Sequence, residues 1–286
     1  MNTPDQLNRY IFEEMNVRGE LVQLAESYQQ MLKNHHYPDS IKHIIGELFA
    51  ATSLLTATLK FTGDIAVQIQ GNGPVSYVAI NGTDKQALRG VARFSEAPKD
   101  LNLSSAFGDK GFMVITITPE KGERYQGIVA LEQETIAGCL QDYFRQSEQL
   151  DTHIWLYTDT KQALAAGMLL QRLPGEEKEQ DDANMEHLAQ LTSTVKHDEI
   201  FSLAAQDLLY RLYHQERVKV FEPQSVTFHC GCSKDKTYNA LASIQPNELT
   251  AILQEEGKIE VKCEYCLTKY SFVENDLADL LNKPQH

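Results

Sequence analysis

The sequence predicts an α+β fold in three parts: an N-terminal domain with a mixed or antiparallel sheet and packed helices, a helical linker, and a small C-terminal zinc-binding module. Three observations lead to this division. Strand and helix patterns fill residues 1–174, an acidic stretch lies within residues 175–225, and four of the five cysteines occur in residues 226–286. A chain of 286 residues is also long for a single domain.

The first segments predict a strand pair and a long helix. Residues 5–13 and 17–24 are short and apolar enough to be strands joined around Gly19, and residues 27–34 predict one or two helical turns. Pro38 and Asp39 then begin a longer helix, which should lie against a sheet. Its apolar residues recur at helical spacing: Ile41, Ile44, Ile45, Leu48, Ala51, Leu55 and Leu59.

The remainder of the N-terminal domain predicts further strands and one helix. Strand patterns occupy residues 64–70, 75–80, 112–118, 124–131, 153–157 and 167–173. Asn81-Gly82 predicts a turn after the second of these, and residues 119–122 predict a hairpin turn after the third. Residues 135–148 predict an amphipathic helix, and the domain is expected to end near Pro174.

The composition changes after Pro174. Residues 175–199 hold eight acids and only Lys178 and Lys196 as basic residues, which predicts a linker or a weakly held helix. Residues 200–216 are amphipathic and need a surface to cover, and residues 218–221 predict a strand. An acidic hinge joined to an apolar helix favours low local stability in residues 175–225.

The last 61 residues predict a small separate fold. A helix begins at Pro246 and ends at Glu256, where Gly257 suits the C-terminal cap. Ile259 and Val261 alternate as in a strand, and Tyr270 and Phe272 should supply the core.

Two close cysteine pairs carry the strongest chemical signal. Cys230-Gly-Cys232 and Cys263-Glu-Tyr-Cys266 are separated by thirty residues, and four thiolates in two pairs match one tetrahedral zinc ion. Two structural disulfides are disfavoured because nothing marks the chain for export, and buried apolar fillers would not cluster in pairs. His229 could substitute as a ligand or lie behind the ligands, although four sulfurs already complete the tetrahedron.

The spacing of the sulfurs also points to a redox switch. Each pair is near enough to close on itself if the metal is lost, and the one-residue pair would form a strained, labile ring. Metal-bound thiolates are in the nucleophilic form that peroxide attacks first. A module near sixty residues has a marginal core, so losing an ion worth about 10–16 kcal/mol should unfold it.

Charge and composition exclude several other classes of function. A net charge of −14 argues against nucleic acid as the main partner, and the most apolar run, residues 48–59, is too short and polar to span a membrane. The first residues do not resemble a signal peptide, so a cytoplasmic location is expected. No phosphate loop, nucleophile elbow or paired acid–base motif indicates an enzyme. Cys139 is expected to be a buried small side chain rather than a reactive thiol.

The residues resemble the heat shock protein 33 family, which comprises redox-regulated holdase chaperones. The paired cysteines match its signature, and the resemblance extends over nearly the full length. The further matching stretches are Arg9-Tyr10-Ile11-Phe12, Val17-Arg18-Gly19-Glu20-Leu21, residues 51–61, Arg89-Gly90-Val91-Ala92-Arg93, Gly122-Glu123-Arg124-Tyr125-Gln126-Gly127, Glu148-Gln149-Leu150, Gly167-Met168-Leu169-Leu170-Gln171 and Arg211-Leu212-Tyr213-His214.

This resemblance implies an ATP-independent chaperone that is inactive while reduced and bound to one zinc ion. Oxidation would form the disulfides Cys230–Cys232 and Cys263–Cys266 and expel zinc. The C-terminal module and the linker would then unfold, and homodimers would bind unfolding client proteins under oxidative and heat stress.

Two hypotheses of other classes remain open from the residues alone. A cytosolic thiol–disulfide oxidoreductase using Cys263 and Cys266 would turn over a disulfide substrate without zinc, although the βαβ context of such enzymes is missing. A constitutive zinc-ribbon adaptor would bind a partner protein, and oxidation would simply destroy that binding.

Overall fold

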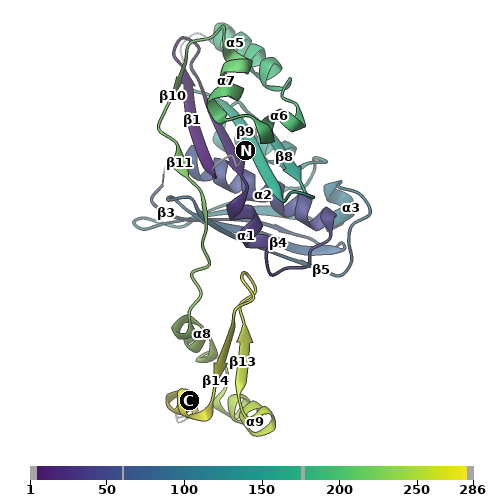
Figure 1. Cartoon of the computed structure of the whole chain (residues 1–286), viewed down its shortest axis with the longest axis vertical. Coiled ribbons are helices and arrows are strands. Elements are labelled where there is room, and N and C mark those ends of the chain that lie inside the picture. Colours follow the sequence, from purple (N-terminus) through teal and green to yellow (C-terminus); the bar gives the residue numbers. More distant parts are fainter. Residues whose placement is uncertain (1–4, 60, 175–177, 282–286) are drawn as a thin grey trace. The chain divides into compact units, whose positions relative to one another are not determined.

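The computed structural model describes residues 5–59, 61–174 and 178–281 (Figure 1). Residues 1–4, Lys60, the first linker residues 175–177 and residues 282–286 lie outside the described residues. The chain separates into two compact units, Met1–His229 and Cys230–His286. Residues 175–225 belong to the first unit by their contacts, and their role as a separate linker stays a prediction.

The first unit contains two sheets, which makes the fold α+β as predicted. One sheet has the order β10 (Val218–Val220), β1 (Gln6–Phe12), β2 (Val17–Leu24), β9 (Leu164–Arg172), β8 (Thr152–Asp159), and β11 (Gln224–Ser225) also pairs with β1. The other has the order β12 (Thr227–Phe228), β5 (Ala87–Phe94), β4 (Val75–Thr83), β3 (Gly63–Gln70), β6 (Phe112–Pro119), β7 (Tyr125–Ala130). The described pairings are antiparallel except β12 with β5, which is parallel.

Helix α2 (Asp39–Thr58) lies between these two sheets and is the centre of the main core (Figure 1). Fourteen of its 20 residues are buried, and the helix contacts β2, β8 and β9 of one sheet and β3, β4 and β5 of the other. The buried hydroxyls of Thr52, Thr56 and Thr58 donate to carbonyl oxygens one turn earlier, at 2.7–2.8 Å. Because these donors are satisfied within the helix, their burial costs little.

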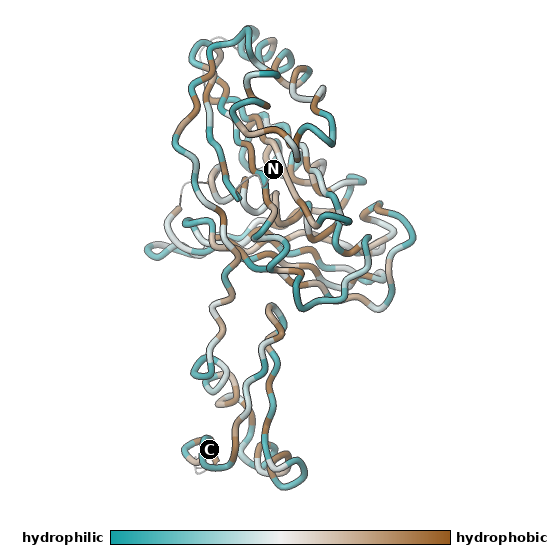
Figure 2. The backbone as a smooth tube through the Cα atoms, in the orientation of Figure 1, coloured by the Kyte–Doolittle hydropathy of each residue, from teal (hydrophilic) through white to brown (hydrophobic). Residues whose placement is uncertain are grey.

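The acidic segment forms helices that cover the outer face of the first sheet. Helices α5 (Lys178–Thr192), α6 (His197–Ser202) and α7 (Ala205–Tyr213) lie over strands β1, β2 and β9 (Figure 1). Hydrophilic and hydrophobic residues alternate along α5 in Figure 2. Its apolar side chains, with those of α6 and α7, complete a second core: Met185, Leu188, Ile200, Leu208, Leu209, Leu212 and Tyr213. We call these three helices the cover.

Two predicted turns were wrong, and both contained a glycine that packing requires. Gly19 lies inside β2, where an added Cβ would come within 2.2 Å of the Tyr10 ring. The turn lies instead at residues 13–16, and Asn16 adopts a positive φ of 47°. Gly82 likewise lies inside β4 against Leu88, and the chain turns at residues 84–86. A glycine therefore marked close packing here and not a reversal of the chain.

Several elements of the first unit were missed, including the two-residue strands β11 and β12, and three helices complete the unit. Strand β5 escaped prediction because Arg89, Gly90 and Arg93 interrupt its apolar pattern, and the short helix α3 (Leu103–Phe107) was also missed. Helix α1 (Glu26–Leu32) is as expected. The helix predicted over residues 135–148 is α4 (Ile136–Tyr143), which continues as the π-helical turn η1 (Phe144–Glu148).

The second unit is small and has its own core. It contains α8 (Lys234–Leu241), α9 (Pro246–Glu256), the hairpin of β13 (Ile259–Lys262) and β14 (Lys269–Phe272), and the terminal turns η2 (Glu274–Leu277) and α10 (Ala278–Leu281). Gly257 ends α9 in the left-handed conformation, as expected. Six buried apolar side chains form the core: Leu241, Leu249, Ile259, Phe272, Leu277 and Leu280. None of the described helices in either unit has both the length and the apolar character of a membrane span.

A buried carboxyl group makes the stability of the first unit depend on pH. Glu20 on β2 is 2% exposed and is joined to Thr58 Oγ1 by a 2.7 Å hydrogen bond. Burial raises the pKa of Glu20 to about 7, although Thr58, Arg18 and Arg9 act in the opposite direction. Because the folded state favours the neutral Glu20 carboxyl, this group contributes its full stabilisation below pH 4.5. The stabilisation is lost as the pH rises through about 7.

We expect Glu20→Gln to stabilise the first unit at pH 8 by about 3 kcal/mol, because the neutral amide avoids ionisation of a buried group. Denaturant unfolding of both proteins at pH 5 and pH 8 measures the effect. The wild type should lose stability between these values and the variant should lose less. An identical pH dependence in the two proteins would contradict the assignment.

Candidate metal centre

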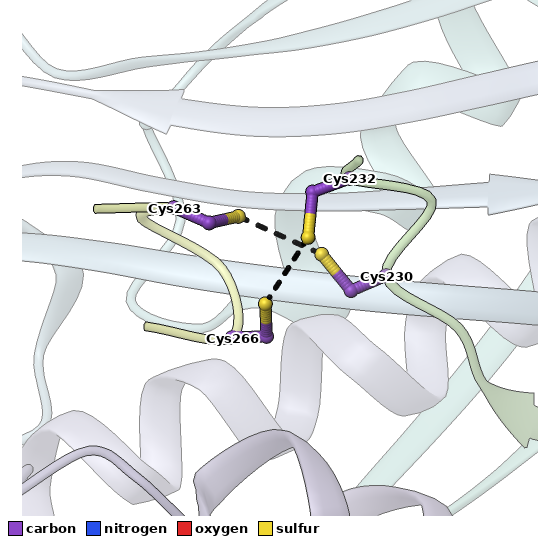
Figure 3. A group of neighbouring side chains, drawn as sticks. All are labelled: Cys230, Cys232, Cys263 and Cys266. Atoms are coloured by element: carbon purple, nitrogen blue, oxygen red, sulfur yellow. Dashed lines mark hydrogen bonds between the residues drawn. The ribbon is translucent and has the colours of Figure 1, made fainter. Parts of the chain in front are cut away.

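The four paired cysteines meet at one point of the second unit. Cys230 and Cys232 lie in the loop before α8, and Cys263 and Cys266 lie in the turn between β13 and β14. Their sulfur atoms all lie within 4.8 Å of one another (Figure 3). The Sγ atoms of Cys230 and Cys263 are 3.6 Å apart, and those of Cys232 and Cys266 are 3.4 Å apart.

These distances fit four ligands of one metal ion. A tetrahedral ion with metal–sulfur bonds of about 2.3 Å separates its sulfurs by about 3.8 Å, whereas a disulfide brings them to about 2.05 Å. All four cysteines are free thiols of intermediate burial. The fold therefore brings together the four cysteines that the sequence singled out, and their arrangement could hold a metal ion.

Local hydrogen bonds shape both loops. In the hairpin, Cys263 N–H donates to Thr268 O and Leu267 N–H donates to Cys263 O, each at 2.9 Å, and Leu267 adopts a φ of 59°. These bonds close the Cys263–Cys266 turn so that both sulfurs face inward. In the first loop, Lys236 Nζ donates to Gly231 O at 2.7 Å, and the Ser233 side chain caps α8. Helix α8 thus fixes the loop that carries Cys230 and Cys232.

Two hydroxyl groups contact the sulfurs, and sequence reasoning missed this role for both. Tyr270 Oη donates to Cys232 Sγ at 3.1 Å, and Thr268 Oγ1 lies 3.2 Å from Cys266 Sγ. Tyr270 was expected in the core, and it does pack against the core with its ring. The alternation of Thr268, just before β14, with Tyr270 and Phe272 on β14 could have indicated that all three share a face.

The sulfurs differ electrostatically because of these contacts. Burial raises the pKa of Cys230 to about 12. Burial also acts to raise the pKa of Cys266, but hydrogen bonds from Thr268 outweigh it and lower the value to about 6. A bound divalent cation would favour the thiolate form at all four positions.

Comparison with known proteins identifies the family. The model of the family described as Hsp33 protein matches residues 5–273. The chain belongs to the Hsp33 family. Proteins named 33 kDa chaperonin are similar to it over almost their whole length. The one from Shewanella woodyi is 56% identical, covering 98% of this chain and 97% of the relative, and the one from Colwellia psychrerythraea is 52% identical, covering 98% of each.

A solved structure supports the fold of this Hsp33 family member. The crystal structure of the 33 kDa chaperonin from Thermotoga maritima, a heat shock protein 33 homologue, matches with a TM-score of 0.80. The match covers 97% of this chain and 98% of that one at 22% sequence identity. At that identity the likeness concerns the fold alone.

The other candidate residues lie outside the four-sulfur group. Among the described residues, the only group of His, Cys, Asp and Glu spaced for a metal ion consists of the four cysteines, so His229 is not part of it. Cys139 is buried in α4, and burial raises the pKa of its thiol, which suits an unreactive side chain. Cys263 and Cys266 lie in a β-hairpin turn, a setting that does not favour a thioredoxin-like redox pair.

Replacing Cys263 by Ser should weaken metal binding and unfold the second unit, because one soft ligand is lost and the remaining core is small. We expect the metal content per chain to fall well below one, and hydrogen exchange to rise across residues 230–281. Residues 5–174 should keep their protection. The variant Cys139→Ala is the matched control and should bind metal normally. Full metal content in Cys263→Ser would refute this ligand set.

Proposed function

We propose that this Hsp33 family member is a redox-regulated, ATP-independent chaperone that holds unfolding proteins after its paired thiols are oxidised. The observation that carries the proposal is the cluster of four metal-spaced thiols, which a short extended segment joins to the helices that cover an apolar sheet face. The naming of close relatives as 33 kDa chaperonin supports a chaperone function.

The ion proposed for the reduced protein is a single Zn²⁺. Four thiolates in tetrahedral spacing form the soft donor set that zinc prefers in structural sites, and zinc itself has no redox chemistry. The proposed ligands are Cys230, Cys232, Cys263 and Cys266. The ion supplies the energy that keeps the second unit folded, since six buried apolar side chains alone form a marginal core.

Oxidation of the sulfurs removes the ligands. In each pair, one thiolate attacks peroxide, its O–O bond breaks, and a sulfenic acid and hydroxide form; the second thiolate then displaces hydroxide to give a disulfide. Two equivalents of peroxide convert four thiolates and four protons into two disulfides and four waters. The proposed disulfides are Cys230–Cys232 and Cys263–Cys266, and neither leaves a thiolate to hold zinc.

The cover is the part of the first unit whose loss would expose a binding surface. Beneath it lie apolar side chains of the first sheet: Tyr10, Phe12, Val17, Leu21, Ala166, Met168 and Leu170. Polar contacts help to hold the cover in place. Gln23 Nε2 of β2 donates to the carbonyl oxygens of Ile200 and Leu203 at 2.7 and 3.0 Å. Within the cover, Arg211 Nε on α7 donates to Glu199 Oε1 on α6 at 2.7 Å.

The segment between the cover and the cysteines provides the physical link. Strands β10, β11 and β12 are two or three residues long and attach residues 218–228 to the edges of both sheets. Such short pairings contribute few hydrogen bonds, so they give way at low cost. Unfolding of the second unit would therefore free this segment and then the cover. The exposed apolar face would bind unfolding proteins in the cytoplasm, and two such chains would form a homodimer.

Oxidised protein should suppress client aggregation and reduced protein should not. Treatment with peroxide at heat-shock temperature should release about one zinc per chain, and light scattering of a thermally unfolding client should then fall without ATP. Protein kept in dithiothreitol is the control. Equal suppression by the reduced, zinc-bound form would contradict the switch.

Two further measurements, disulfide turnover without zinc and partner binding after oxidation, separate the other two hypotheses. Turnover of a disulfide substrate by protein stripped of zinc would favour an oxidoreductase that uses Cys263 and Cys266. Loss of all binding on oxidation would favour a constitutive zinc-ribbon adaptor.

Replacing Gln23 by Leu should loosen the cover, because the carbonyl oxygens of Ile200 and Leu203 would lose a buried donor at a cost of about 1–3 kcal/mol. We expect faster hydrogen exchange in residues 178–213 of the reduced protein and chaperone activity at a lower peroxide dose. Gln190→Leu is the matched control, because Gln190 is exposed on α5 and makes only a 3.4 Å bond to Glu186. Equal exchange in both variants would rule out this role.

A further inference from the structure

We propose that the outer edge of strand β1 binds an extended segment of an unfolding client, which joins the first sheet as an added strand. In the structure this edge is occupied by the chain's own residues 217–226, which we call the edge segment. The inference rests on the proposed function, because the edge segment must be released before a client can take its place. What the edge recognises is the main chain of the client.

The edge segment lies along β1 as two short antiparallel strands (Figure 1). Strand β10 pairs three residues with β1, and β11 pairs two. Phe221 N–H donates to Arg9 O at 2.9 Å, and Glu13 N–H donates to Arg217 O at 3.1 Å. On its other side, β1 pairs with β2 along all seven of its residues. Strand β1 therefore has one long pairing that holds it in the sheet and one short pairing that another strand can replace.

The edge segment uses the edge of β1 incompletely. Pro223 separates β10 from β11, and a proline has no N–H to give to a sheet. Asn8 lies between the residues of β1 that pair with β10 and those that pair with β11. Its side chain is 5% exposed, and its Nδ2 has no hydrogen-bond partner among the described residues. A continuous strand would pair along the whole of β1, including the stretch opposite Asn8.

The side chains around the edge indicate which client segments fit it. Val218 and Val220 of β10 pack against the second core, and the residue between them is exposed. Tyr10 and Phe12 of β1 belong to the same core. When a strand is added to a sheet, main-chain hydrogen bonds give affinity and alternate side chains give selectivity. The edge therefore suits any extended segment with apolar residues at every second position, which matches a chaperone with many clients.

Two other edge strands carry caps from side chains that do not belong to the edge segment. Ile154 N–H of β8 donates to Gln141 Oε1 at 2.8 Å, and Ala92 N–H of β5 donates to Tyr37 Oη at 3.1 Å. The described bonds at the outer edge of β1 go instead to the main chain of the edge segment. Release of that segment leaves donors and acceptors of β1 unpaired, and such an edge is a template for another strand.

A peptide of residues 215–226 that carries fluorescein is the probe, in two N-methylated forms. Methylation at Phe221 removes the N–H that donates to Arg9 O and keeps every side chain. Methylation at Val220 is the matched control, because successive N–H groups of a strand point to opposite edges. We expect full-length, peroxide-oxidised protein to bind the control peptide about tenfold more tightly by fluorescence anisotropy. Equal affinities for the two peptides would overturn the proposal.

Lys219→Pro makes the test independent of the redox switch. Lys219 pairs with Ile11 and has the same strand parity as Phe221, so the proline removes an N–H that faces β1 and detaches the edge segment. The reduced, full-length variant should bind the control peptide, and reduced Lys219→Ala should not. Binding by Lys219→Pro without binding by oxidised wild type would support the edge site and count against the switch. Absence of binding by both would overturn the edge site.

Competition in the aggregation assay connects the edge to clients. Excess unlabelled peptide methylated at Val220 should raise the light scattering of a client held by the oxidised protein, and the peptide methylated at Phe221 should not. Equal effects of the two peptides on the client, or no effect of either, would overturn the proposal. Sedimentation in the same titration tests a second copy of the chain as the occupant. A peptide that separates dimers and leaves client holding unchanged would assign the edge to self-association and contradict the proposal.

Discussion

The spacing of four sulfur atoms is the constraint on which the second unit depends. Sulfur–sulfur distances of 3.4 and 3.6 Å suit ligands around a common ion and leave each thiol too far from its neighbours to be bonded to them. The described part of the unit has only six buried apolar side chains, so a metal ion bound by the four cysteines would couple binding to folding. In the proposed mechanism, oxidation of the sulfurs would therefore unfold the second unit.

The first unit combines a resistant centre with a weaker surface layer. Helix α2 is enclosed between two sheets. The buried hydroxyls of Thr52, Thr56 and Thr58 have hydrogen-bond partners within the helix, so their burial costs little stability. The cover, by contrast, consists of three helices in which acidic residues outnumber basic ones. Apolar side chains of each helix and a few polar contacts hold it on the sheet. Local unfolding starts where the buried apolar area is small, which favours loss of the cover over loss of the sheet.

The cover also explains why an acidic segment of low hydropathy is ordered. Eight acids in residues 175–199 argued for a linker, and the helices that form there bury residues such as Met185 and Leu188. Their apolar positions are too sparse to stabilise a helix alone. They become sufficient because Phe12, Leu21 and Leu170 of the sheet lie beneath them. Segments held mainly by such long-range contacts are those that sequence patterns describe least well.

The sequence by itself determined which four cysteines form the candidate metal centre, most strands and helix α2, because these depend on local signals: cysteine spacing, alternation of apolar residues and helical periodicity. It misplaced the turns at Gly19 and Gly82, since a glycine that admits an aromatic ring or a leucine looks the same in a sequence as one that reverses the chain. Only the tertiary structure decided that α2 has a sheet on either side, that the acidic segment covers an apolar face, and that Thr268 and Tyr270 contact the sulfurs. Each of these depends on residues far apart in the chain, whose meeting is fixed by packing and not by local pattern.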